Sequence, residues 1–186
     1  MLEKMPFPIL FVLLVCTISF TQESRDSGPS RRSQAQCKFS DEGTITVDYF
    51  SPSMEGRRIF GDLLPYGKVW RTGDKAIAFA TDEDLVAKKG TNIPAGNYIF
   101  TMIPNLGKWT LIINKNTVYE SGEIARVPMS VKKLSALVEN FTISFDPTGG
   151  SCTMHMIWEN TEAWLEFAKR NTDLPSRVAD PRRPPK

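Results

Sequence analysis

The residues whose types could do chemistry gather in one segment, residues 50–73, which reads FSPSMEGRRIFGDLLPYGKVWRTG. It connects segments with a strand-like pattern, and connections of this length inside a compact domain are usually functional or disordered. Disordered segments are poor in apolar side chains. This one contains, among others, Ile59, Phe60, Leu63, Leu64, Tyr66, Val69 and Trp70. We therefore expect it to pack against the domain as a long loop.

Cationic residues are interleaved with these aromatic residues: the segment contains Arg57, Arg58, Lys68 and Arg71. Aromatic rings beside guanidinium groups form sites for planar or anionic ligands, through stacking and bidentate hydrogen bonds. The candidate ligand-binding residues are therefore Arg57, Tyr66, Trp70 and Arg71, together with Asp74, a carboxylate directly after the segment.

A purely structural role for the same residues is the alternative. Tyr66 and Trp70 would then anchor the loop in the core. Arg71 would pair with a nearby carboxylate, for which the sequence offers Asp62, Asp74 or Asp82.

Other kinds of site find less support. His155 is the only histidine, it lies opposite the apolar face of a strand-like run, and no GxSxG motif presents a serine to it. The chain has 21 acidic residues, but its pattern singles out no two of them as a glycosidase pair. No Cys/His spacing fits a metal and no glycine pattern fits a phosphate, so we expect neither a metal nor a cofactor.

Export is predicted from the N-terminus. Lys4 precedes an apolar run at residues 7–20, which is shorter than the ~20 residues that span a bilayer and fits a secretory signal peptide. Small residues place the cleavage site before Gln22. The alternatives are an uncleaved membrane anchor and a lipid-modified Cys16, although Val15 is not the small residue that a lipoprotein signal has before its cysteine. We expect the cleaved protein to have no membrane span and to be periplasmic or extracellular.

The cysteine count agrees with export. Cys16 would leave with the signal peptide, so Cys37 and Cys152 remain. Two cysteines in an oxidising compartment form a natural disulfide pair. The alternative is two unpaired buried thiols.

Composition divides the chain into four parts. Residues 1–21 are the signal peptide, residues 22–36 a polar flexible spacer, residues 37–168 the folded domain, and residues 169–186 a disordered tail rich in Pro and Arg. The net charge is only +2, which does not favour nucleic-acid binding.

Within the domain the apolar period is two, which is typical of half-buried strands. Strands are predicted at residues 44–49, 76–81, 97–103, 109–114, 140–145 and 152–158, with weaker ones at 124–129 and 164–167. Residues 131–139 are expected to hold a helical turn. Many short strands between Gly/Pro turns predict an all-β, mostly antiparallel single domain, a sandwich or a barrel, with one long packed loop.

The runs SPSMEGRRIFGDLLPYGKVWRTG, NIPAGNYIFTMIPNLGKWTLIINK and ENFTISFD together resemble the domain-of-unknown-function family 2911 of exported bacterial proteins. The resemblance implies a β-rich exported domain and no established activity, substrate or cofactor. Family members commonly continue WRTG with Ala-Asn-Glu-Ala, whereas Asp74 to Ile77 follow here. The family's acidic residue is therefore missing or displaced to Asp74.

The favoured function is a non-catalytic binding module, with the Tyr66, Trp70 and Arg71 loop holding a small molecule, glycan or peptide, and Tyr98 and Trp109 as further contacts. Two alternatives stay open. One is a structural or assembly partner in the cell envelope. The other is a hydrolase that uses Arg71 for electrostatic stabilisation and Asp74 or a distant carboxylate for acid–base work.

Overall fold

Alternate burial along the chain produces a fold made of strands. In the computed structural model the described residues are 31–70, 76–87, 90–115 and 122–170. The strands are β1 (Arg31–Lys38), β2 (Thr44–Ser51), β3 (Ile77–Thr81), β4 (Leu85–Ala87), β5 (Thr91–Ile93), β6 (Gly96–Ile103), β7 (Trp109–Asn114), β8 (Glu123–Pro147) and β9 (Ser151–Lys169). Over these ranges no helix is long and apolar enough to cross a membrane.

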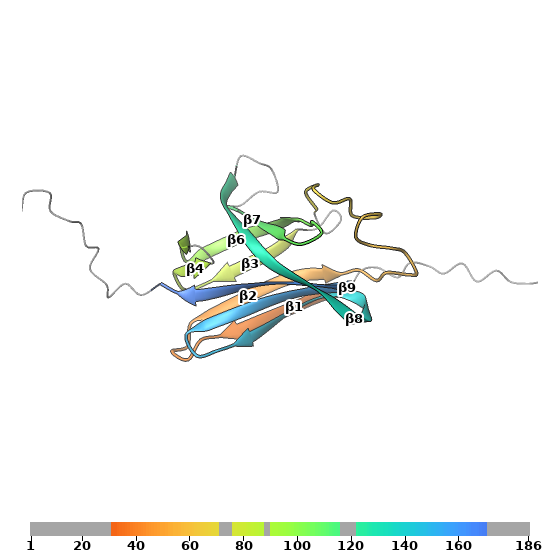
Figure 1. Cartoon of the computed structure of the whole chain (residues 1–186). Coiled ribbons are helices and arrows are strands. Elements are labelled where there is room, and N and C mark those ends of the chain that lie inside the picture. The colour runs from red at the N-terminus through yellow and green to blue at the C-terminus, as the bar shows by residue number, and fades with distance from the viewer. Residues whose placement is uncertain (1–30, 71–75, 88–89, 116–121, 171–186) are drawn as a thin grey trace, which may run out of the picture.

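All nine strands belong to one antiparallel sheet, which confirms the all-β prediction. Its order is β1-β2-β3-β6-β7-β8-β9-β4-β5, and the ladder is not closed. β8 begins beside β7 and crosses to the layer that contains β1 and β2 (Figure 1). There Tyr49 of β2 meets Ile143 of β8 through hydrogen bonds in both directions, from the Ile143 N–H to the tyrosine oxygen at 3.0 Å and from the tyrosine hydroxyl to the Ile143 carbonyl at 3.4 Å.

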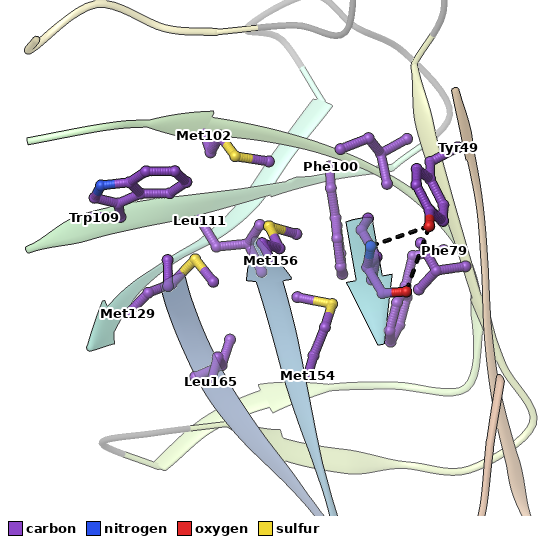
Figure 2. Packing of buried hydrophobic residues seen from close by; sticks show 14 of the residues in the cluster. Tyr49, Phe79, Phe100, Met102, Trp109, Leu111, Met129, Met154, Met156 and Leu165 are labelled. Atoms are coloured by element: carbon purple, nitrogen blue, oxygen red, sulfur yellow. Dashed lines mark hydrogen bonds between the residues drawn. The ribbon is translucent and has the colours of Figure 1, made fainter. Parts of the chain in front are cut away.

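The core lies between these layers and is built from aromatic, aliphatic and methionine side chains. Phe79 stacks on Phe100 with ring centroids 4.4 Å apart, and it also contacts Phe167 of β9 at 5.5 Å. Figure 2 shows Met154 and Met156 of β9 pointing into the same cluster, with the hydrogen bonds of Tyr49 drawn at one side. The alternate residues of β2 and β9 supply this core, as their period of two predicts.

β8 and β9 differ from the expected short strands, because they have 25 and 19 residues and are bent. Lys133 pairs with Thr161 and Val138 with Glu159, so residues 134–137 of β8 lie opposite Asn160 alone. Extra residues on one strand bend a hairpin. The helical turn expected at residues 131–139 is therefore wrong: the extra residues interrupt the period of two without leaving the strand.

The bend folds β9 back on itself. The backbone N–H of Lys169, at its end, donates to the carbonyl oxygen of Gly150, just before its start, at 3.4 Å. His155 Nδ1 lies 2.7 Å from Glu162 Oε1, although seven residues of straight strand would separate their Cα atoms by about 23 Å. Glu159, at the bend, has a left-handed φ of 55°.

The N-terminal boundary of the domain also differs from the prediction. β1 begins at Arg31 and therefore includes residues 31–36, which were expected in the spacer. β1 pairs with β2 from Arg31↔Ser51 to Lys38↔Thr44, so backbone hydrogen bonds hold a polar segment whose composition resembles a linker. β9 continues to Lys169. The predicted signal peptide and most of the predicted tail lie outside the described residues.

The Cys37–Cys152 disulfide is present, as predicted. Both cysteines are buried, and the bond ties the end of β1 to the start of β9. Nearby, the Ser40 N–H donates to the carbonyl oxygen of Gly149 at 3.3 Å. The edge strand is thus fixed to the β8–β9 hairpin covalently as well as by hydrogen bonding.

Removing this disulfide should destabilise the domain strongly. The bond spans 115 residues, and the chain-entropy model gives roughly 4–5 kcal/mol for a loop of that order. We expect the Cys37→Ser/Cys152→Ser protein to lose about this much free energy of unfolding in urea titrations. A loss below about 1 kcal/mol would contradict a structural role for the bond.

Candidate functional site

The long loop between β2 and β3 is fixed to the sheet where it begins and where its described part ends. Ser53 forms a β-bridge with Asn140 of β8. Trp70 forms a β-bridge with Met102 of β6, and its N–H donates to the Met102 carbonyl oxygen at 2.6 Å. The Gly67 N–H donates to the carbonyl oxygen of Pro104 at 2.9 Å. Residues 52–70 are therefore a packed loop, as the apolar content predicts, and form a wall at one end of the two layers (Figure 1).

A tight turn within the loop sets the position of Tyr66. The Leu64 N–H donates to the Ile59 carbonyl oxygen at 2.8 Å, and the Gly61 N–H donates to the Leu64 carbonyl oxygen at 2.9 Å. Gly61 has a φ of 90°, and a Cβ atom there would lie 2.8 Å from a ring carbon of Tyr66. Glycine thus allows both the turn and the close approach of the tyrosine ring.

Trp70 anchors the loop through its ring. The indole packs edge-on against Phe141 with ring centroids 5.1 Å apart and lies 5.8 Å from Trp158. Ten residues earlier, Phe60 contacts Trp109 at 4.9 Å and Trp158 at 6.5 Å. The loop is therefore held by aromatic contacts, which is the structural role that the sequence left open for Trp70.

The other candidates have different surroundings. The Arg57 guanidinium donates to the carbonyl oxygens of Met54 at 2.9 Å and Ser53 at 3.0 Å, so it closes its own turn. Arg71 and Asp74 lie outside the described residues.

A cleft of about 500 Å³ opens between the loop and the bend of β8 and β9. It is lined by Arg58, Phe60 and Tyr66 from the loop, Asn105, Leu106 and Trp109 from the β6–β7 turn and the start of β7, Val131, Lys132 and Lys133 from β8, and Glu159, Asn160 and Thr161 from β9. Of the three candidates that the structure describes, Arg57, Tyr66 and Trp70, only Tyr66 lines this cleft. Trp109, named as a further contact, lines it as well.

More cations than carboxylates line the cleft, and some of these charged side chains already have partners. Glu159, the carboxylate of the lining, accepts a hydrogen bond from the Phe60 N–H at 3.2 Å. Lys132 is paired with Glu162 at 2.9 Å and lies 5.5 Å above the Trp164 ring. Arg58 and Lys133 are exposed and make no ion pair with a carboxylate of the described residues. The cleft is therefore a cationic hollow with the partly exposed ring of Tyr66 in its wall, backed by the buried rings of Phe60 and Trp109.

Sequence reasoning missed Lys132, Lys133, Asn105 and Asn160. The two lysines lie in the segment expected to be a helical turn, and only the pairing of β8 with β9 brings them opposite the loop. Arg58 was noted in the loop but not chosen. The adjacent pair Arg57–Arg58 could have indicated it, because successive side chains of an extended chain point to opposite sides and one of the two arginines would face away from the other.

Tyr98, the other further contact, lies elsewhere. It is buried, its hydroxyl donates to the Pro94 carbonyl oxygen at 2.7 Å, and it is not among the residues of the cleft. Burial raises the pKa of its hydroxyl, and the charge of Asp84 adds to the effect.

A second cleft, of about 640 Å³, lies beside the folded-back strand β9 and includes His155, Asp146 and Trp164 in its lining. His155 Nδ1 lies 2.7 Å from Glu162, and Nε2 lies 3.2 Å from Asp146. Both ring nitrogens therefore face carboxylates, and neither is left to act as the base for a hydroxyl nucleophile.

Glu162 connects the two clefts, because it contacts Lys132 of the first and His155 of the second. Burial raises the pKa of its carboxyl, but hydrogen bonds from Lys132 and His155 together outweigh burial, so the net shift is downward. Glu162 therefore stays charged in the folded protein and holds Lys132 in place. Across the described ranges no group of three or more His, Cys, Asp or Glu residues could hold a metal ion.

Comparison with known proteins identifies the family of the chain. A family model described as a protein of unknown function (DUF2911) matches residues 30–167, and the chain belongs to this family. The match begins one residue before β1 and ends within β9, so it covers the folded domain. No curated protein and no solved structure matches the chain.

Replacing Trp70 should destabilise the fold. Trp70→Ala removes the contacts with Phe141 and Trp158, and we expect a loss of about 3 kcal/mol in the free energy of unfolding, at the low end for a buried aromatic residue because Trp70 is only half-buried. The exposed neighbour is the matched control: Val69→Ala should change stability by less than about 0.5 kcal/mol. Equal effects of the two variants in urea titrations would show that the Trp70 ring is no anchor.

Proposed function

We propose that the domain is a non-catalytic binding module that acts outside the cytoplasm and holds a small molecule, glycan or peptide in the cleft beside the long loop. The predicted signal peptide and the Cys37–Cys152 disulfide support the location. The single observation that carries the proposal is the cleft, whose walls combine aromatic rings with two cations that have no carboxylate partner among the described residues.

The shape of the cleft supports binding. Its volume of about 500 Å³ lies within the range of about 300–1,000 Å³ that is usual for small-molecule sites. The contact of Phe60 with Trp109 fixes one wall, and the Gly61 turn fixes Tyr66. A cleft formed before the ligand arrives loses little conformational entropy on binding.

The polar groups of the cleft favour binding over catalysis. Hydrolysis by acid–base chemistry needs a carboxylate or histidine free to exchange a proton with the substrate. Among the described residues that line the cleft, Glu159 is the one carboxylate and there is no histidine, because His155 lies in the other cleft between two carboxylates. The hydrolase alternative would need Arg71 with Asp74 or another carboxylate.

A thermal-shift screen of metabolites, glycans and peptides on the mature domain tests this proposal. A ligand that binds the folded state stabilises it by RT ln(1 + [L]/Kd), so even a modest binder raises the melting temperature. We expect at least one class of compound to do so, and we expect Tyr66→Ser and Lys133→Ala to reduce the shift.

The control variant is Lys38→Ala, which removes an exposed lysine of β1 that does not line the cleft. It should leave the shift unchanged. The proposal fails if no compound stabilises the protein, or if the stabilisation survives both cleft variants. Turnover of the bound compound would replace the binding module by the hydrolase alternative.

A further inference from the structure

We infer that the ligand of this cleft is an organic anion, a carboxylate or a phosphate ester carried on a flat and weakly polar body. This inference rests on the proposed binding function and names the chemical class that the site selects. It follows from which charges around the cleft are already neutralised and which are not.

Three cations and one carboxylate line the cleft. Lys132 is neutralised by Glu162 at 2.9 Å, whereas Glu159 keeps its charge and accepts one hydrogen bond from the Phe60 N–H at 3.2 Å. Arg58 and Lys133 pair with no carboxylate in the described part of the chain, so together they outweigh the single charge of Glu159. The field in the cleft is therefore net positive, which attracts an anion and repels a cation.

The two available cations come from different elements. Arg58 lies in the loop turn, where its carbonyl oxygen accepts a hydrogen bond from the Leu63 N–H at 3.4 Å. Lys133 belongs to the last regular pair of β8 and β9 before the bulge, opposite Thr161. The guanidinium presents a planar fork that matches two oxygens of a carboxylate or phosphate, and the ammonium adds a point charge. An anion bound between them would bridge the loop and the hairpin.

The walls select the rest of the ligand. Tyr66, which is partly exposed, offers its ring, and Leu106, which is 82% exposed, adds an apolar contact. Phe60 and Trp109 are 4% and 1% exposed and support this wall from the core. A flat body packs on such a ring, and charge pairs beside apolar walls are stronger than in open water. A bare inorganic anion would contact the cations but leave the apolar surface of the cleft exposed to water.

Substitution of Glu162 is expected to raise the affinity for an anion rather than lower it. It neutralises Lys132 in the same cleft, so Glu162→Gln removes a negative charge and releases a third cation toward the ligand. A site that recognises anions should then bind them more tightly, whereas a cleft that only loses a structural contact should bind them less well. Gain and loss of affinity therefore separate recognition from damage to the fold.

Isothermal titration calorimetry of the mature domain with matched probes tests the inference. The probes are phenyl phosphate, benzoate, benzamide, benzylammonium and inorganic phosphate. We expect phenyl phosphate to bind best and benzoate next. Benzamide and inorganic phosphate should bind roughly tenfold more weakly than phenyl phosphate, and benzylammonium should not bind. Affinity for the organic anions should fall as sodium chloride is raised.

The variants sharpen the result. Arg58→Gln and Lys133→Gln should each weaken phenyl phosphate binding roughly tenfold, as expected for one charge-assisted hydrogen bond. Glu162→Gln should strengthen it by a few fold, and Lys38→Gln, outside the cleft, should not change it. Circular dichroism and melting curves of each variant identify any that fails to fold, and Arg58 and Lys133 are exposed, so their variants should fold.

Two outcomes overturn the inference. One is equal affinity for benzamide and benzoate. The other is a screening hit that is neutral or cationic, whose binding depends on Tyr66 but not on Arg58 and Lys133. In both cases the cleft still binds a ligand, so the proposed function would stand. Failure of every compound in the screen and of every probe would instead overturn the function and this inference together.

Discussion

The contact between the long loop and the bend of β8 and β9 is the interaction on which the rest of the structure depends. Trp70 and Phe60 bring their rings against Trp158, which lies one residue before the bend, and against Phe141 and Trp109. These rings bury the apolar side of the loop and leave its cationic side beside β8. Without this packing the loop would be a free connection and the cleft would have no second wall.

The bend in turn depends on an unequal pairing. Residues 134–137 of β8 lie opposite Asn160, and Glu159 accepts a left-handed φ of 55°, a conformation that costs a non-glycine residue on the order of 1 kcal/mol. His155 and Glu162 then meet across the fold of β9. One local irregularity thus produces both the wall of the first cleft and the polar bridge to the second.

The sequence predicts features that depend on neighbouring residues better than features that depend on residues far apart in the chain. The period of two identified β2, β6, β7 and the start of β9, because alternate burial is visible in consecutive residues. The number of cysteines left after signal cleavage identified the disulfide. β1 was missed because a polar edge strand is held by backbone hydrogen bonds that composition does not reveal. The cleft lysines were missed because the bulge decides what they face. The packing of the loop was predicted from its apolar content, but no pattern marks the partners of Arg57, which are two backbone carbonyls and Glu55 within the same turn.

Amide hydrogen exchange of residues 54–70, read beside that of β6, tests most directly whether the loop is a built wall of a preformed cleft. The account predicts that the N–H groups of Leu64, Gly67 and Trp70 exchange nearly as slowly as those of β6, because each donates to a carbonyl oxygen within the fold, at 2.8, 2.9 and 2.6 Å. Exchange of these three amides at the rate of an unfolded chain, with β6 still protected, would contradict it.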